Sequence, residues 1–409
     1  MSVGTAGVGF SENQDSLEAG RQAAAEALER AGHGPAGLVL AFCTGKHDYE
    51  ACFAGIRSVT GNAAPVVGGA ALGIITNDRL GYEGHEVGVA VLPAGLDFRT
   101  AASGALDDDE TRTGIDLGAQ LKRVRRPDDE LLLLFYDSIK KPPPPAPVLN
   151  VSTLLLDGLL QTIGEAPPPI VGAGLVGDYA FSPVRLFCGG SVADQHAVGV
   201  LMSGNCTAFQ TIMHGCKPIS DYHTITRVEG TIVYEIDGKP AARVIDELLG
   251  TQEWQKRMPL LTVTLGVNYG DKYAPFNEDS YVNRLIVGHL PEQEALVLFE
   301  ADCDDGTEFQ FMQRSSHLML QSAEARCEGA MARIAREKVR PILALYIDCA
   351  GRTSAFSISD VEEASVVQRI LGDDIPLLGF YSGVEIAPLL GRSRGLDWTG
   401  VLLVIATGS

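Results

Sequence analysis

One pattern recurs three times along the chain and constrains the fold more than any other feature. An apolar run is followed by a segment of helical periodicity, then by a Pro, two apolar residues and a Gly, and finally by another apolar strand. The period is too long and too uneven for a solenoid, so a repeated α/β unit is predicted. Ligands usually bind at the strand ends of such units. The apolar runs are residues 38–42, 131–135 and 342–346, the Pro-containing segments are 65–69, 169–173 and 376–380, and the closing strands are 87–92, 197–202 and 401–406.

The predicted fold class is α/β, with two domains built from three related β-α-β-β units and mixed sheets flanked by helices. Residues 1–205 hold the first two units. Residues 206–409 hold a hairpin and strand insertion followed by the third unit, because alternating apolar residues and turn residues run from about 224 to 238. A chain of 409 residues is long enough for two or three domains.

The charge balance argues against two classes of partner. The formal net charge is −20 at pH 7, whereas sequence-independent binding to nucleic acid needs clustered Lys and Arg. The same charge argues against anchoring on anionic lipid. No segment reaches the ~18 uninterrupted apolar residues of a membrane span, and the basic run at residues 122–126 is expected to be a solvated loop. We therefore expect no nucleic acid and no membrane among the partners.

The cysteines and the first residues bear on the cellular compartment. The eight cysteines are scattered without a CxxC pair, so neither a zinc ribbon nor a thioredoxin motif is present. Residues 1–10 lack the basic region and long apolar core of a signal peptide. Reduced thiols and a cytoplasmic location are therefore expected.

An ordered set of motifs resembles the FIST family over nearly the whole chain. The opening motif, with the Ala-rich segment after it, is similar to the start of FIST N-terminal domains, and the middle motifs look like the junction into the FIST C-terminal domain. The last two motifs resemble that domain's C-x-x-R and GGEI-type sequences. Val384 departs from the family, which has a second glycine there, so the turn before Glu385 is expected to differ. The motifs are residues 7–11, 215–219, 226, 234–241, 348–352 and 379–388.

The resemblance implies a sensory protein. FIST domains are described as intracellular modules that bind small ligands and are often joined to signalling output domains. A subset looks like haem-binding nitric-oxide sensors that stand alone and regulate a partner kinase. No kinase, cyclase or methyl-accepting helix pattern is recognisable in this sequence. A small-molecule ligand and a separate output protein, such as a signalling kinase, are therefore the expected partners.

Four residues of the third unit are candidates for a ligand pocket. Cys349 and Arg352 follow the third apolar run, where ligands dock in open α/β sheets. A guanidinium lowers the pKa of a neighbouring thiol and can pair with a ligand carboxylate. Tyr381 can stack on a planar ligand, and Glu385 lies in the turn beside it. The alternative is structural: Cys349 packs as a small apolar residue and Arg352 pairs with Glu385.

The resemblance also directs attention to ligands for haem iron. His214 and Cys216 lie between the second unit and the predicted hairpin, and an imidazole or a thiolate can ligate haem iron. Arg227 and Arg352 are candidate partners for the propionates. If haem b is bound, His214 is expected to be the axial ligand, with Cys216, Cys349 and His223 as the next choices. The alternative for His214 is a hydrogen-bonded loop histidine.

Two functions are compatible with these observations. The first is an intracellular sensor that binds a small ligand, with haem and nitric oxide as the named case, and signals through a partner protein. The second is an enzyme that acts on a small carboxylate-bearing molecule in a pocket of Cys349, Arg352 and Glu385. Against a catalytic role, Cys349 has no histidine with an evident pairing in the sequence.

Overall fold

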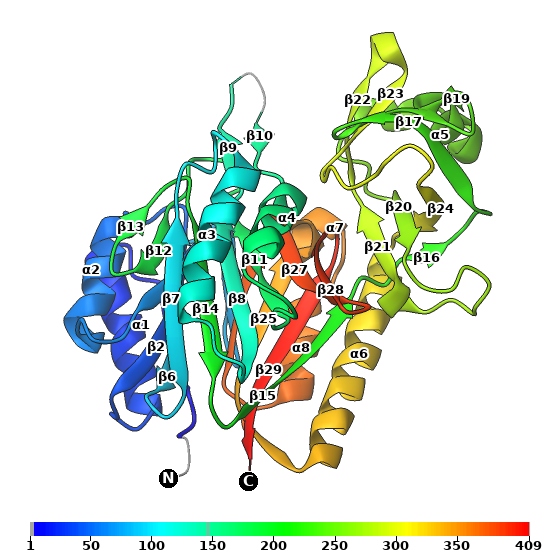
Figure 1. The fold of residues 1–409 in the computed structure, drawn as a ribbon. Coiled ribbons are helices and arrows are strands. Elements are labelled where there is room, and N and C mark those ends of the chain that lie inside the picture. The colour runs from blue at the N-terminus through cyan, green and yellow to red at the C-terminus, as the bar shows by residue number, and fades with distance from the viewer. Residues whose placement is uncertain (1–3, 145–146, 409) are drawn as a thin grey trace.

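Three successive α/β units account for most of the chain in the computed structural model, which describes residues 4–144 and 147–408 (Figure 1). Residues 1–3 of the opening segment considered above lie outside this part. The first unit comprises β1 (Gly7–Ser11), α1 (Ser16–Arg30), β2 (Ala36–Thr44), α2 (Tyr49–Thr60), β3 (Val66–Ala71), β4 (Gly73–Thr76), β5 (Leu80–Tyr82) and β6 (Val87–Pro93). The second comprises β7 (Asp97–Ser103), α3 (Glu110–Val124), β8 (Asp129–Asp137), β9 (Ile139–Lys141), β10 (Val148–Leu149), α4 (Ser152–Thr162), β11 (Ile170–Leu175), β12 (Leu186–Gly189), β13 (Val192–Ala193) and β14 (Ala197–Ser203). The third comprises β15 (Cys206–Met213), α6 (Ser316–Glu337), β25 (Val339–Cys349), η4 (Ala350–Arg352), α7 (Ser354–Ser357), α8 (Glu363–Leu371), β26 (Leu377–Ser382), β27 (Val384–Leu389), β28 (Arg392–Leu396) and β29 (Gly400–Gly408).

The units form three mixed six-stranded sheets that share one strand order. In each sheet the first strand of the unit lies at an edge, next to the closing strand and then the two central strands, as in β1-β6-β2-β3. The central strands pair in parallel because a helix connects them, and the closing strand is antiparallel to its neighbour. The predicted α/β class, with mixed sheets flanked by helices, is confirmed.

Each sheet is completed by a hairpin from another unit. The β12-β13 hairpin of the second unit pairs with β3, the β27-β28 hairpin of the third unit pairs with β11, and β4-β5 of the first unit pairs with β26. The exchange closes a ring, so every unit depends on another for its full sheet. The proposed boundary at residue 205 falls between β14 and β15. That the two halves are separate domains stays a prediction, since these hairpins cross the boundary in both directions.

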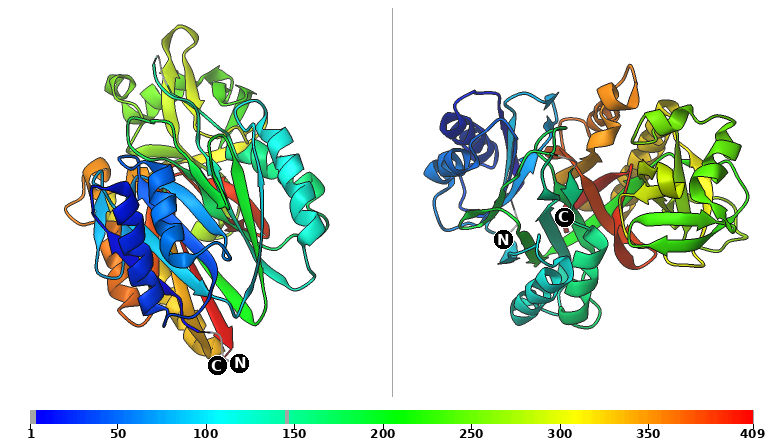
Figure 2. Two further views of the ribbon diagram at one scale, coloured as in Figure 1. Left: turned by 90° about the vertical axis from the view of Figure 1, so that its left-hand side faces the viewer. Right: turned by 90° about the horizontal axis from the view of Figure 1, so that it is seen from above.

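Aromatic side chains from the three sheets meet in the interior. Figure 2 shows the helices on the outside of the strands when the molecule is seen from above. Phe42 of β2, Phe135 of β8 and Phe380 of β26 are all fully buried. The ring centroids of Phe42 and Phe380 are 3.9 Å apart, and those of Phe42 and Phe135 are 5.4 Å apart. Contacts between these rings therefore join the three sheets at the centre of the molecule.

Glycine allows the outer helices of the first two units to pack closely. A Cβ atom at Gly20 of α1 would lie 2.2 Å from the carbonyl oxygen of Cys52 in α2. In the second unit, a Cβ at Gly114 of α3 would lie 2.2 Å from the carbonyl oxygen of Leu155 in α4. Any side chain at these positions would push the paired helices apart. Among the described residues, no helix has both the length and the hydrophobicity needed to cross a membrane.

An inserted lobe, residues 214–315, separates β15 from α6 and projects from the three sheets (Figure 1). Its strands form a nine-stranded sheet. A hydrophobic core of its own includes Trp254, Phe309 and Phe311. The elements of the lobe are β16 (Lys217–Pro218), β17 (His223–Glu229), β18 (Ile232–Ile236), β19 (Lys239–Pro240), α5 (Ala241–Leu249), η1 (Glu253–Lys256), β20 (Val263–Asn268), η2 (Glu278–Ser280), β21 (Tyr281–Arg284), β22 (Ile286–Leu290), η3 (Pro291–Gln293), β23 (Ala295–Leu298) and β24 (Glu308–Gln313).

The structure differs from the sequence-based expectation in three places. The first strand of each unit was not predicted, because β1, β7 and β15 are edge strands with few consecutive large apolar residues. The sequence pattern predicts a strand over residues 181–187, but β12 begins only at Leu186, since the preceding segment is a loop in which Phe181 has φ of 54°. The basic run was expected to be a loop, but Lys122 and Arg123 lie in the last turn of α3, where cations favour the helix dipole.

Candidate functional site

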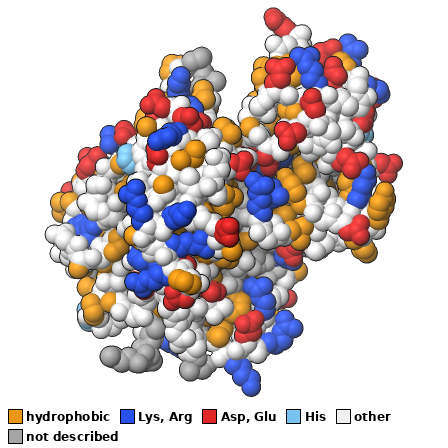
Figure 3. Space-filling model, viewed as in Figure 1, with side chains coloured by type: hydrophobic (Ala, Val, Ile, Leu, Met, Phe, Trp, Pro, Cys, Tyr) orange, Lys and Arg blue, Asp and Glu red, His pale blue; other side chains and the backbone are white. Residues whose placement is uncertain are grey.

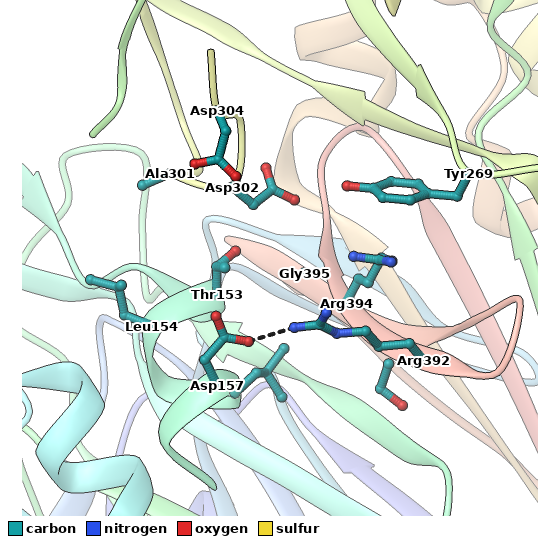
Figure 4. A pocket seen from close by; sticks show the side chains of 12 residues that line it. Thr153, Leu154, Asp157, Tyr269, Ala301, Asp302, Asp304, Arg392, Arg394 and Gly395 are labelled. Carbon is teal, nitrogen blue, oxygen red and sulfur yellow. Dashed lines mark hydrogen bonds and ion pairs between the residues drawn. The ribbon is translucent and has the colours of Figure 1, made fainter. Parts of the chain in front are cut away.

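A cavity of about 360 Å³ lies between the inserted lobe and the rest of the molecule (Figure 4). One side is formed by the start of α4 and by β28, and the other by the residue after β20 and the loop after β23. The second unit, the third unit and the lobe therefore all contribute to its wall. In the space-filling view the lobe is set off from the rest by a hollow, and acidic and basic side chains are interspersed on both (Figure 3). The cavity is lined by Thr153, Leu154, Leu156, Asp157, Tyr269, Ala301, Asp302, Asp304, Arg392, Ser393, Arg394 and Gly395.

Arg394 brings a positive charge to this cavity. Its guanidinium lies over the ring of Tyr269, with 3.7 Å between Cζ and the ring centroid. Within the described chain, Arg394 forms no salt bridge, and its buried Nε has no hydrogen-bond partner. Burial lowers the pKa of Arg394, but a guanidinium stays protonated in proteins. The face of the tyrosine ring and the nearby negative charge of Asp302 both favour its cationic form.

Most of the other charges in the cavity wall are paired. Arg392 donates a hydrogen bond of 2.7 Å to Asp157, as the dashed line in Figure 4 marks. Asp302 accepts a hydrogen bond of 2.6 Å from Arg284; burial alone would raise the pKa of Asp302, but the guanidinium lowers it. Asp304 is exposed to solvent. The charge of Arg394 thus stands out against paired or solvated neighbours.

Glu300 joins the inserted lobe to the start of α4, next to the cavity. Its carboxylate accepts hydrogen bonds from the backbone N–H and the hydroxyl group of both Ser152 and Thr153, at 2.7–3.2 Å. The N-cap residue of α4 is Val151, whose side chain cannot accept such bonds. The lobe therefore supplies the cap of this helix, where a negative charge is favourable. Burial nevertheless raises the pKa of Glu300.

A second set of contacts between the lobe and the rest of the molecule involves β28, the strand that carries Arg394. Arg284, which is fully buried, donates a hydrogen bond of 3.1 Å to the carbonyl oxygen of Gly395. Asp397 accepts a hydrogen bond of 2.8 Å from the backbone N–H of Leu285. Any movement of the lobe would therefore strain the contacts beside the cavity.

The four residues predicted to share a pocket lie in two groups at the ends of β25 and β26. Cys349 is paired with Ser382 in the register of these strands, and Ser382 donates a hydrogen bond of 2.8 Å to Glu385. Tyr381 points to the other face because side chains alternate along a strand, and its hydroxyl donates to Glu362 at 3.3 Å. The structure thus brings Cys349 and Glu385 together and separates Tyr381 from them. The cavity beside α4 is lined by other residues.

Arg352 pairs with Glu363 and Asp348, so the alternative considered from the sequence, a pairing with Glu385, is wrong. Its guanidinium donates hydrogen bonds of 2.6 and 2.5 Å to the two carboxylate oxygens of Glu363, and its Nε lies 3.3 Å from Asp348. It also donates to the carbonyl oxygens of His214 and Trp398. The first turn of α8 places Glu363 on this guanidinium, which is fully buried. Arg352 is therefore committed to interactions within the fold.

The surroundings of Cys349 oppose its activation as a nucleophile. The side chain is 6% exposed. Burial raises the pKa of the thiol well above its ordinary value, and the nearby charges of Glu385 and Asp348 act in the same direction. The thiolate, which is the reactive form, is therefore disfavoured. These surroundings give no support to the enzyme hypothesis.

His214 is a buried, hydrogen-bonded residue between β15 and β16. Its Nδ1 accepts a hydrogen bond of 3.0 Å from the backbone N–H of Cys216, and the opposite nitrogen, Nε2, lies 3.2 Å from the carbonyl oxygen of Glu278. This network assigns the ring proton to Nε2, so both nitrogens are occupied. Burial lowers the pKa of His214 and raises that of the Cys216 thiol to about 12. Neither residue fits an axial ligand of haem iron in this arrangement, because the iron needs a free imidazole nitrogen or a thiolate.

The remaining predicted ligand residues lie on the surface of the inserted lobe. Arg227 packs over the ring of Tyr234, 4.4 Å from its centroid, and pairs with Glu229 on the same hairpin. His223 lies 2.7 Å from Asp237. In the described part of the chain, no group of His, Cys, Asp and Glu side chains is arranged to hold a metal ion.

Little in the sequence indicated which residues line the cavity. Tyr269, Glu300 and Arg394 come from separate segments, so no fixed spacing links them. One local signal existed: Arg392 and Arg394 are two residues apart in a strand that follows a turn at Gly391, which places both on one face.

Comparison with known proteins establishes the family. Residues 37–239 match the FIST N domain and residues 241–388 match the FIST C domain. The chain therefore belongs to the FIST family, as the ordered motifs indicated. FIST domains are generally sensory domains that bind small ligands in signal transduction.

Similar proteins occur in bacteria and archaea. An uncharacterized protein of Mycobacterium tuberculosis is 26% identical over 399 residues, which are 95% of this chain and 96% of the relative. An uncharacterized protein of Mycobacterium bovis is 26% identical over 226 residues, 55% of this chain and 57% of the relative. One of Methanocaldococcus jannaschii is 35% identical over 94 residues, 22% of this chain and 18% of the relative.

Two solved structures share a distant likeness with the chain. A chorismatase is 11% identical with a TM-score of 0.33, and a cyanuric acid hydrolase is 11% identical with a TM-score of 0.38. In both cases the comparison covers 100% of each chain. Likenesses at these TM-scores carry no argument about function.

Proposed function

We propose that this protein is a cytoplasmic sensor that binds a small ligand in the cavity between the inserted lobe and α4, and that it signals through a partner protein such as a kinase. The observation that carries the proposal is the cavity wall, which is built jointly by the lobe and by the second and third units. Ligand sites commonly lie between structural units in this way. A volume of about 360 Å³ suits a small molecule.

The position of the cavity also supplies a route for a signal. The loop after β23 contributes Ala301, Asp302 and Asp304 to the wall, while Glu300 in the same loop caps α4. A ligand that contacts this loop favours the arrangement in which the lobe is docked on α4. A ligand can shift an equilibrium between two arrangements only through such differential contacts. A partner protein that recognises the docked lobe would then respond to the ligand.

A variant that fills the cavity tests the proposal. Leu154 lines the cavity on α4 and is 37% exposed, so Leu154→Trp is expected to fold and to obstruct binding. Leu17 is a matched control, because it is 49% exposed on α1, in the first unit. Thermal unfolding is followed by fluorimetry while a library of small metabolites is added, since a ligand that binds only the folded protein raises its unfolding temperature.

At least one compound should raise the unfolding temperature of the parent and of Leu17→Trp, but not of Leu154→Trp. Hydrogen exchange should then slow, on adding that compound, in the loop at residues 299–307 and in the first turn of α4. A shift that is equal in all three proteins would place the ligand elsewhere. If the compound stabilised the protein without changing the rate of hydrogen exchange in this loop, the proposed signal route would be wrong.

A further inference from the structure

The cavity contains an arginine whose guanidinium is held in place but forms no salt bridge among the described residues. Tyr269 holds the guanidinium of Arg394 at 3.7 Å, and the Nε of Arg394 is buried without a hydrogen-bond partner among the described residues. A buried donor that stays unsatisfied costs free energy, and the cost is larger for a charged group. The other N–H groups of this guanidinium also have no acceptor among the described residues, and a ligand in the cavity can supply one. The site is thus prepared for a ligand group that accepts hydrogen bonds.

The other arginines near the cavity show that this condition is particular to Arg394. Arg392 reaches Asp157, and Arg284 reaches Asp302 and the carbonyl oxygen of Gly395. The carboxylates of Asp157 and Asp302 are consequently occupied by these two arginines. The planar guanidinium of Arg394 presents the fork of donors that matches an oxyanion in a bidentate geometry.

We infer that Arg394 and Tyr269 form an anion-recognising end of the cavity, and that the ligand carries a carboxylate or phosphate group bound by the guanidinium of Arg394. The inference rests on the proposed function and specifies the chemical class of the ligand. Arg394 lies on β28, the hairpin strand that the third unit contributes to the sheet of the second unit, whereas Tyr269 belongs to the lobe. An anion bound here therefore contacts both sides of the boundary between the lobe and the sheets.

Inorganic phosphate and benzoate are suitable probes, because one is tetrahedral and the other is a planar carboxylate. Their binding is measured by titration calorimetry at constant ionic strength, with sodium chloride as the reference salt. The variants are Arg394→Gln, Arg394→Lys and the control Arg243→Gln, since Arg243 is paired with Glu294 on the surface of the lobe. At least one probe should bind the parent and the control. Arg394→Gln should weaken it by about 10- to 100-fold, the loss typical of hydrogen bonds to a charged group.

Arg394→Lys should bind more weakly than the parent, because an ammonium keeps the charge but lacks the planar fork. A preference for one probe would distinguish a phosphate from a carboxylate ligand. Failure of both probes to bind, or equal binding by the parent and Arg394→Gln, would overturn the inference. The proposed function would survive that result if a neutral compound still stabilised the parent but not Leu154→Trp. If these substitutions changed the binding of neither the anions nor the neutral compounds, both the inference and the proposed function would be wrong.

Discussion

Replacing Arg352 with Met separates a structural role from a ligand-binding role at a position that the sequence assigned to the pocket. The guanidinium is fully buried and is salt-bridged to Glu363 and Asp348. It also donates hydrogen bonds to the carbonyl oxygens of His214 and Trp398. Met has a similar length but no charge, so Arg352→Met leaves two buried carboxyl groups without their cation.

The expected loss of stability is large. Removing one partner of a buried ion pair typically costs about 3–5 kcal/mol, because the remaining charge is left uncompensated. A folded protein is stabilised by only about 5–15 kcal/mol in total. The surface pair of Arg243 and Glu294, whose side chains are 62% and 41% exposed, provides a control. Arg243→Met should cost less than about 1 kcal/mol.

The loss should also depend on pH. Burial already raises the pKa of Asp348 and of Glu363, and Arg352 opposes both shifts. Without the guanidinium these pKa values rise further, so the folded variant binds protons more tightly than the unfolded chain does. The stability of Arg352→Met should therefore fall as pH rises above the ordinary carboxyl range near 4, and recover on acidification. The deficit relative to the parent should be smaller at pH 5 than at pH 8.

Urea unfolding at these two pH values, followed by circular dichroism, measures both effects. Adding Glu363→Gln to Arg352→Met should restore part of the stability, because it removes one of the two uncompensated charges. A loss below about 1 kcal/mol would refute the structural role that we assign to Arg352. So would a deficit that is the same at pH 5 and pH 8. Unchanged stability combined with lost ligand binding would instead support the pocket role expected from the sequence.

Three further predictions concern single groups. Cys349 should resist a thiol-specific reagent in the folded protein at pH 8, since burial raises the pKa of its thiol; labelling as fast as that of an unfolded control would contradict this. Both ring nitrogens of His214 take part in hydrogen bonds, so added haemin should give no Soret band that depends on His214. A Soret band that is abolished by His214→Ala and shifted by nitric oxide would instead support haem sensing. Burial raises the pKa of Asp397 to about 7, so ionisation of this carboxyl group should lower the stability of the folded protein as pH rises from about 4 to about 7. Asp397→Asn should flatten that part of the pH profile measured by urea unfolding. An unchanged slope in the variant would exclude Asp397 as the cause.

The repeated apolar runs determined the central strands because their signal is local. Residues 38–42, 131–135 and 342–346 lie within β2, β8 and β25, since a fully buried strand needs a continuous apolar run wherever it pairs. The segments of helical periodicity that follow these runs likewise contain α2, α4 and α8. The edge strands β1, β7 and β15 were missed because an edge tolerates polar residues, which weakens the pattern on which the prediction depends.

The pairing of the hairpins was decided by tertiary structure. Nothing within residues 384–396 indicates that β27 and β28 add to β11 rather than to a strand of their own unit. The choice depends on how the three sheets meet around Phe42, Phe135 and Phe380. It is therefore a property of the assembled units and not of the hairpin sequence.

The same distinction holds for the functional residues. The sequence placed Cys349 and Glu385 near each other correctly, because both follow neighbouring strands of one unit. It could not decide the partner of Arg352, since Glu363 and Glu385 are both acidic and only the packing of α8 brings one of them to the guanidinium. Arg394 and Tyr269 meet only because the inserted lobe docks on a strand 125 positions further along the chain, and contacts over such separations are set by packing rather than by spacing.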